Sequence, residues 1–93
     1  MSEIEAKAIL EEELSRYRRR SYSELLSLVD CSETSERASP SGLTYQVEVQ
    51  VSFDDLSQRN LRVMGAIDDK VWSALKPMSD DFIIAPDGTF VGE

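Results

Sequence analysis

Residues 43–53 read LTYQVEVQVSF, and this stretch decides the fold. Six apolar residues alternate strictly with five polar residues, from Leu43 to Phe53. Side chains of a β-strand point alternately to its two faces, whereas a helix repeats about every 3.6 residues. We therefore predict a half-buried strand over residues 43–53 with its apolar face in the core. Because it is long for a strand, we expect it to be central to its sheet.

A second alternating segment, LRVMGAI, follows at residues 61–67. The residues between the two segments, 54–60, read DDLSQRN and have the composition of a turn. Two alternating runs joined by a short turn are typical of a β-hairpin. We therefore predict that residues 43–53 and 61–67 pair as antiparallel strands.

The segment VWSALK at residues 71–76 is ambiguous between a short helix and a strand. Its apolar residues fit a helical stripe about as well as they fit an alternating pattern. The strand is favoured because residues 68–70 can form a tight turn and Pro77 ends the run.

Residues 82–93 read FIIAPDGTFVGE and contain two short β-prone runs, 82–85 and 89–91. The tripeptide Pro-Asp-Gly at 86–88 separates them. Proline presets φ for the first central position of a type I turn, aspartate suits the second, and glycine accepts a positive φ. We interpret the tripeptide as a hairpin turn and not as a functional site.

The N-terminal third indicates two helices. Residues 3–19 place apolar residues close to a helical stripe, with glutamates early and arginines late, which matches the helix dipole. Ser21 followed by Glu24 is the capping-box pattern and predicts a second helix over residues 22–30. Short helices are marginal alone, so we expect both to pack on the sheet.

Residues 31–42 read CSETSERASPSG and show no periodicity. Turn-forming and polar residues dominate this segment, which predicts a mobile loop. It would connect the helical part, residues 1–30, to the β-sheet part, residues 43–93, within a single domain spanning residues 1–93.

Composition restricts the function. The chain has 93 residues, no histidine and a net charge of −8. Without histidine there is no Ser-His-Asp triad and no imidazole ligand for zinc, so we expect no enzyme and no cofactor. Strong acidity opposes nucleic acid and anionic membranes as partners. The N-terminus lacks a signal-peptide pattern, no apolar run is long enough to span a membrane, and the lone Cys31 cannot form an internal disulfide, so we expect a cytoplasmic protein.

Three Asp-Asp pairs, at 54–55, 68–69 and 80–81, are candidates for Ca²⁺ or Mg²⁺ ligands. In a meander, the first and third pairs would share one end of the sheet, and the second would join Asp87 at the other end. Their spacing matches no EF-hand loop, and aspartate is common in turns for local reasons. Turn chemistry is the favoured interpretation, and no residue is assigned to a metal.

Two further features have a functional and a structural interpretation. RYRRR at residues 16–20 resembles an anion-binding or nucleic-acid-binding patch, but its place at a predicted helix end, the many glutamates and the negative net charge favour a structural role. Trp72 is either an exposed anchor for a partner or a sheet residue covered by the helices.

Four stretches resemble a family of small bacterial proteins of unknown function. They are SYSELLSLVD at 21–30, SGLTYQVEVQVSFDD at 41–55, LRVMGAIDD at 61–69 and FIIAPDGTFVGE at 82–93. The resemblance implies a bacterial, cytoplasmic α+β domain and transfers no catalytic residues. Where members of the family have a glycine-rich turn, this chain has DDKVW at 68–72.

These observations predict an α+β fold in which two N-terminal helices pack on one face of a four- or five-stranded antiparallel, mostly meander sheet. The polar face of the sheet stays in solvent or meets a partner. We expect a non-catalytic module that binds a protein or a second copy, with Glu48, Gln50 and Trp72 as partner-binding residues. The alternative is a domain that binds a small ligand or a divalent metal through its aspartate-rich turns.

Overall fold

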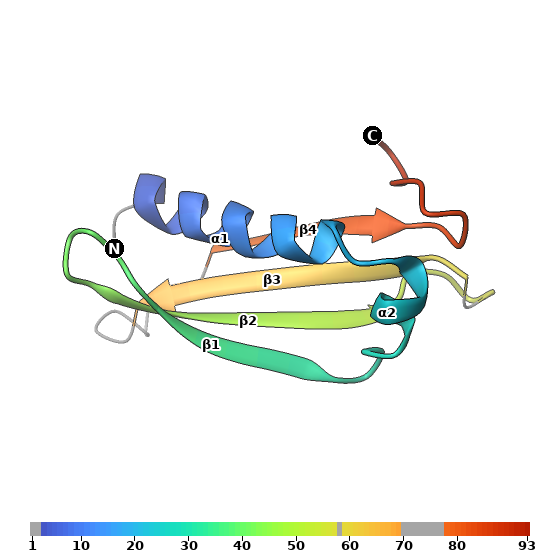
Figure 1. The fold of residues 1–93 in the computed structure, drawn as a ribbon, viewed down its shortest axis with the longest axis horizontal. Helices are drawn as coiled ribbons and strands as arrows, with labels where there is room; N and C mark the ends of the chain where they lie inside the picture. The colour runs from blue at the N-terminus through green and yellow to red at the C-terminus, as the bar shows by residue number, and fades with distance from the viewer. Residues whose placement is uncertain (1–2, 58, 70–77) are drawn as a thin grey trace.

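The computed structural model describes residues 3–57, 59–69 and 78–93. Four strands form one antiparallel sheet in which spatial order follows chain order, as Figure 1 shows. They are β1 (Ser32–Ala38), β2 (Thr44–Phe53), β3 (Leu61–Asp69) and β4 (Met78–Ile84). The predicted α+β class and the meander are confirmed.

The central hairpin has the predicted alternation. β2 pairs with β3 so that Val47 lies opposite Ile67 and Val51 lies opposite Val63. All four side chains are buried, whereas the polar residues Glu48 and Gln50, which alternate with the valines of β2, are exposed. The strict period of two therefore separates an apolar face, which forms the core, from a polar face.

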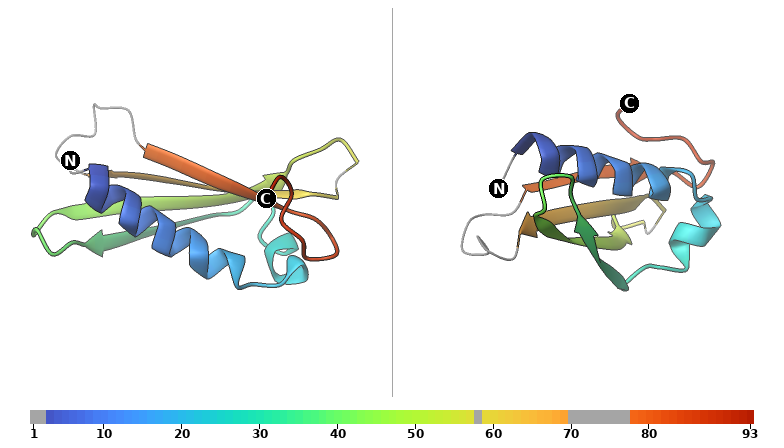
Figure 2. Two further views of the ribbon diagram at one scale, coloured as in Figure 1. Left: turned by 90° about the horizontal axis from the view of Figure 1, so that it is seen from above. Right: turned by 60° about the vertical axis from the view of Figure 1, so that its left-hand side comes forward.

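Helix α1 (Glu3–Arg18) lies along the apolar face and confirms the helix predicted over residues 3–19. Its buried apolar stripe contacts mainly β3 and β4. Two views in Figure 2 show the helix on one side of the sheet only. The apolar residues of this stripe are Ala6, Ile9, Leu10, Leu14 and Tyr17.

The closest approach of α1 to the sheet is at Gly65 of β3. A Cβ atom added at Gly65 would lie 2.9 Å from Leu10 Cδ1 and 3.2 Å from Leu14 Cδ2. Side chains this close would overlap, so the absence of a side chain at position 65 lets the helix rest on the strand backbone.

Helix α2 (Tyr22–Leu26) is shorter than the predicted helix over residues 22–30. Its start is as predicted, because the Ser21 side chain accepts a hydrogen bond of 3.1 Å from the Glu24 N–H. The helix ends early because the chain turns to the sheet, where the Asp30 N–H donates to the Val51 carbonyl. Leu25 is its one fully buried residue, so α1 alone forms a helical layer over the sheet.

The prediction of a mobile loop over residues 31–42 is wrong for most of its length. Residues 32–38 form β1, which pairs with β2 in a regular register from Ser32 opposite Gln50 to Ala38 opposite Thr44. Every residue of β1 is exposed except Arg37, which is half-buried. Backbone hydrogen bonds to β2 order this strand, so it needs no apolar face and shows none in the sequence.

The predicted turns at Asp68-Asp69 and at Asp80-Asp81 are also wrong, because the first pair lies within β3 and the second pair lies within β4, which begins at Met78. In the register of β4 with β3, Asp80 lies opposite Gly65 and Asp81 lies opposite Met64. The predicted strand over residues 71–76 lies outside the described residues.

The Pro-Asp-Gly tripeptide at 86–88 is a hairpin turn, as predicted. The Gly88 N–H donates to the Ala85 carbonyl, and the Ala85 N–H donates to the Thr89 carbonyl, each at 2.9 Å. Gly88 has a φ of 87°, which L-residues rarely adopt. Beyond the turn, Phe90 makes an isolated bridge to Ile84, and residues 78–93 contain no fifth strand.

Candidate functional site

The sheet face opposite α1 is uncovered by any other described element, and we call it the open face. Its residues follow from the registers of the four strands, because residues opposite each other share a face. From β1 and β2 they are Ser32, Thr34, Glu36, Ala38, Thr44, Gln46, Glu48, Gln50 and Ser52. From β3 and β4 they are Arg62, Met64, Ala66, Asp68, Ser79, Asp81 and Ile83.

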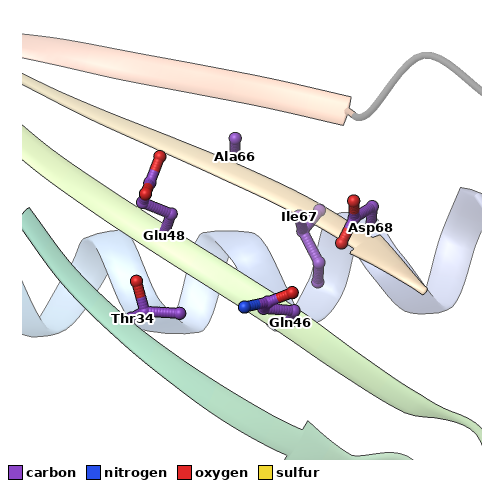
Figure 3. Close-up of a pocket in the computed structure, with 6 residues that line it drawn as sticks. All are labelled: Thr34, Gln46, Glu48, Ala66, Ile67 and Asp68. Carbon is purple, nitrogen blue, oxygen red and sulfur yellow. The ribbon is translucent and has the colours of Figure 1, made fainter. Parts of the chain in front are cut away.

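A shallow hollow of about 240 Å³ lies on the open face. Figure 3 shows its lining side chains on three neighbouring strands, with α1 behind the sheet. The small side chain of Ala66 lies opposite Glu48, and this pairing leaves space between longer neighbours. The lining residues are Thr34, Gln46, Glu48, Ala66, Ile67 and Asp68.

The electrostatics of the hollow are acidic. Among the described residues, neither the Glu48 nor the Asp68 carboxylate has a hydrogen-bond or ion-pair partner. Glu48 is exposed and Asp68 is half-buried. Gln46 lies opposite Asp68 and adds an amide that can donate or accept. The hollow can therefore bind cationic and hydrogen-bond-donating groups.

The positive charge on the described part of the open face is engaged within the protein. Arg62 donates to Asp54 Oδ1 from Nε at 3.0 Å and from Nη2 at 2.7 Å. It also donates to Asp81 from Nη1. The single charge of Arg62 is thus shared between Asp54 and Asp81, and within the described part of the open face no positive charge remains for Glu48 or Asp68.

The aspartates of the turns accept hydrogen bonds from residues of their own loops. Asp55 accepts from the Ser57 hydroxyl at 2.8 Å and from two backbone N–H groups, and these bonds, that from Ser57 first, lower its pKa. Asp87 accepts from the Thr89 hydroxyl and N–H, which lower its pKa in the same way. The described residues contain no group of three or more metal-ligating side chains.

Three of the four arginines at residues 16–20 have partners inside the fold. Arg18 stacks 4.7 Å from the ring centres of both Phe82 and Phe90 and binds both oxygens of the Glu93 carboxylate. Arg20 lies over the Tyr17 ring, 4.6 Å from its centre. Arg16 binds Glu13 at 3.2 Å. These contacts support the structural interpretation of RYRRR.

Two of the three predicted partner-binding residues, Glu48 and Gln50, lie on the open face, whereas Trp72 lies outside the described residues. The sequence reasoning missed Thr34 and considered Asp68 only as a candidate metal ligand, and the structure brings both residues to Glu48. Their positions depend on strand register, and the polar alternation of β2 is the signal that pointed to the shared face.

Fold and site together define the class of protein. It is an α+β domain with one long helix on one face of a four-stranded antiparallel meander and an acidic, uncovered second face. Comparisons of the chain with protein-family models, curated proteins and solved structures find no match. The resemblance to small bacterial proteins stays a prediction. In the described part of the chain, neither helix has the length and apolar content that crossing a membrane requires.

Proposed function

We propose that this protein is a non-catalytic binding module that docks a basic protein segment on its open face. One observation carries the proposal: the carboxylates of Glu48 and Asp68 lie on adjacent strands of an uncovered face, without partners among the described residues. The net charge of −8 favours approach of a cationic partner at long range.

The hollow suits a lysine or arginine side chain. Glu48 lies opposite Ala66, so Asp68 is its diagonal neighbour, and diagonal neighbours are about 7–8 Å apart, with their Cβ atoms somewhat closer. An ammonium or guanidinium group placed between the two carboxylates pairs with both. Its aliphatic stem can lie on Ala66, and Gln46 and Gln50 offer hydrogen bonds at the margin.

The alternative of a metal-binding or ligand-binding domain has less support. The carboxylates of Asp54, Asp55, Asp81 and Asp87 are held by hydrogen bonds within the protein. A cation bound at any of these positions would compete with these bonds for the carboxylate oxygens. No observation in the described residues favours this alternative.

The test is a capture experiment with matched variants of the whole chain. The open-face variant is Glu48→Gln with Asp68→Asn, and the control is Glu3→Gln with Glu11→Gln, which removes the same charge from exposed positions of α1. Wild type and control should retain one basic protein in stoichiometric amount, and the open-face variant should lose it. With that partner purified, the affinity should fall about tenfold in the variant and fall with salt.

Three outcomes would overturn the proposal. They are capture of no stoichiometric partner by the wild type, capture of an acidic partner, and equal retention by the open-face variant and the control. The last outcome would place the binding surface elsewhere on the molecule.

A further inference from the structure

The outer edge of β1 is the exposed polar edge of the sheet. β1 and β4 are the two edge strands. The edge of β4 is partly covered, because the Val91 N–H donates to the Ile83 carbonyl at 2.8 Å. Within the described residues, no backbone group outside β2 pairs with residues 32–38. β1 forms the lower margin of the sheet in Figure 1.

The closing hydrogen bonds of the β1–β2 hairpin show which backbone groups are free. The Ser39 N–H donates to the Leu43 carbonyl at 2.9 Å, so these two residues form a hydrogen-bonded pair. Pairs of an antiparallel ladder alternate between bonded and non-bonded. Glu33, Ser35 and Arg37 therefore bond to β2. The backbone groups of Ser32, Thr34, Glu36 and Ala38 point away from β2, to the edge.

We propose that β1 pairs antiparallel with β1 of a second copy, about a two-fold axis that passes through Ser35. In this register, Thr34 lies opposite Glu36 of the second copy and Ser32 lies opposite Ala38. These are the residues whose backbone groups point outward, so they form the hydrogen-bonded pairs between the two copies.

The charges of β1 favour this register. It places Glu33 opposite Arg37 of the second copy, twice, and opposite charges across a strand pair are stabilising. Glu33 Oε1 already accepts from Tyr17 and forms an ion pair of 3.7 Å with Arg20 Nη1, and Arg37 donates to Glu12 and Glu13 from its two Nη atoms. In the described part of the chain, Glu33 Oε2 and Arg37 Nε have no partner, so both remain for the new pair.

Neighbouring registers are less favourable. An axis through Glu33, Glu36 or Arg37 places that residue opposite its own copy, and like charges opposite each other are destabilising. An axis through Thr34 leaves the end of β1 unpaired and removes the Glu33–Arg37 pairs. Of these registers, the one through Ser35 pairs all seven residues of β1.

This self-pairing is independent of the proposed function, because it uses the edge of the sheet and not the open face. It would join two sheets into one continuous sheet, with both open faces on the same side. Salt should weaken the two Glu33–Arg37 pairs but not separate the copies, because backbone hydrogen bonds carry the pairing and salt also screens the repulsion between two acidic copies. Binding of a basic partner, in contrast, should weaken with salt.

The register is tested by cysteine cross-linking in a Cys31→Ser background. Ser35 and its copy would form a non-bonded pair, whose Cα atoms are about 4.5 Å apart, within the range of a disulfide. Ser35→Cys should therefore give a covalent dimer on mild oxidation. Thr34→Cys, the control, should give far less, because in this register Thr34 lies opposite Glu36.

The interface is tested by measuring mass in solution over a range of protein concentration. The wild type should approach twice the monomer mass at high concentration, and Thr34→Ala should behave likewise. Thr34→Pro should stay monomeric, because proline removes an outward N–H and leaves the bonds to β2 intact. Circular dichroism checks that this variant is folded. If Thr34→Pro does not fold, the cross-linking of Ser35→Cys and Thr34→Cys tests the inference instead.

Three results would overturn the inference. They are a monomer at every concentration, a dimer that Thr34→Pro does not weaken, and cross-linking of Thr34→Cys that equals or exceeds that of Ser35→Cys.

Discussion

Leu10 of α1 lies so close over Gly65 of β3 that a Cβ atom at position 65 would be 2.9 Å from Leu10 Cδ1. Real side-chain carbons do not approach this closely, so the helix position depends on the missing side chain. Leu10 is 1% exposed, which leaves its methyl group little room to move.

Gly65→Val should therefore destabilise the protein by about 1–3 kcal/mol, as overpacking does in well-packed cores. Ala66→Val is the matched control, because it enlarges the side chain at the next position, on the open face. Urea unfolding of the two variants measures the difference. If Gly65→Val is as stable as the control, α1 does not rest on β3 in this way.

Tyr17 should make stability depend on alkaline pH. Burial, followed by the hydrogen bond to Glu33, raises the pKa of Tyr17 from 10.0 to about 12. The unfolded chain therefore loses the Tyr17 proton before the folded chain does. The contribution to the free energy of unfolding is complete below pH 10.0, and it is lost as pH rises from 10.0 to about 12.

Urea unfolding at several pH values measures this effect. Tyr17→Phe should remove this part of the fall in stability, whereas Tyr22→Phe, which keeps Tyr17, should retain it. An unchanged profile in Tyr17→Phe would show that Tyr17 is not responsible for the pH dependence.

Ser21→Ala should cost about 0.5–2 kcal/mol of stability, because it removes the side chain that caps α2. Ser23→Ala is the control, since Ser23 is an exposed residue inside the same helix. Thermal or urea unfolding compares the two variants. Equal stability would mean that the cap of this five-residue helix contributes nothing measurable.

The contacts of Arg18 should hold the C-terminal residues on the sheet. Arg18→Met keeps much of the side-chain volume but loses the hydrogen bonds of 2.7 and 2.8 Å to Glu93. Amide hydrogen exchange at Val91, whose N–H donates to Ile83, should become faster. Arg19→Met, at an exposed residue with no ion pair in the described chain, should leave this rate unchanged. No difference between them would contradict the role of Arg18.

Millimolar Ca²⁺ or Mg²⁺ should not raise the thermal midpoint, because the carboxylates of Asp54 and Asp81 are engaged by Arg62 and that of Asp55 by its own loop. Sodium chloride at matched ionic strength controls for screening. A saturable rise of the thermal midpoint with either divalent ion would contradict this prediction and support the metal-binding alternative.

The sequence predicts those elements whose side chains carry the signal. The alternation of residues 43–53 identifies β2 because one face of the strand is buried. Ser21 and the turn at residues 86–88 are recognisable because their local chemistry determines the backbone. β1 is not recognisable, because an exposed edge strand is ordered by backbone bonds to β2, and its side chains carry no buried pattern.

The candidate site is predictable to the same extent. Glu48 and Gln50 follow from the polar half of the β2 alternation. Asp68 and Thr34 join them only through pairing with β3 and β1, which depends on register between distant segments. The partners of Arg62 cannot be predicted from the sequence either, because the sequence predicts a turn at Asp81, whereas Asp81 lies in β4.

The order of the elements along the chain has a consequence for synthesis. Helix α1 is translated before β3 and β4, although its apolar stripe packs mainly on these two strands. Until those strands have left the ribosome, the side chains of Leu10 and Leu14 have no sheet to pack against and stay exposed to solvent. Formation of the core must therefore wait for distant segments, which makes folding slow and leaves the nascent chain open to aggregation or to chaperone binding.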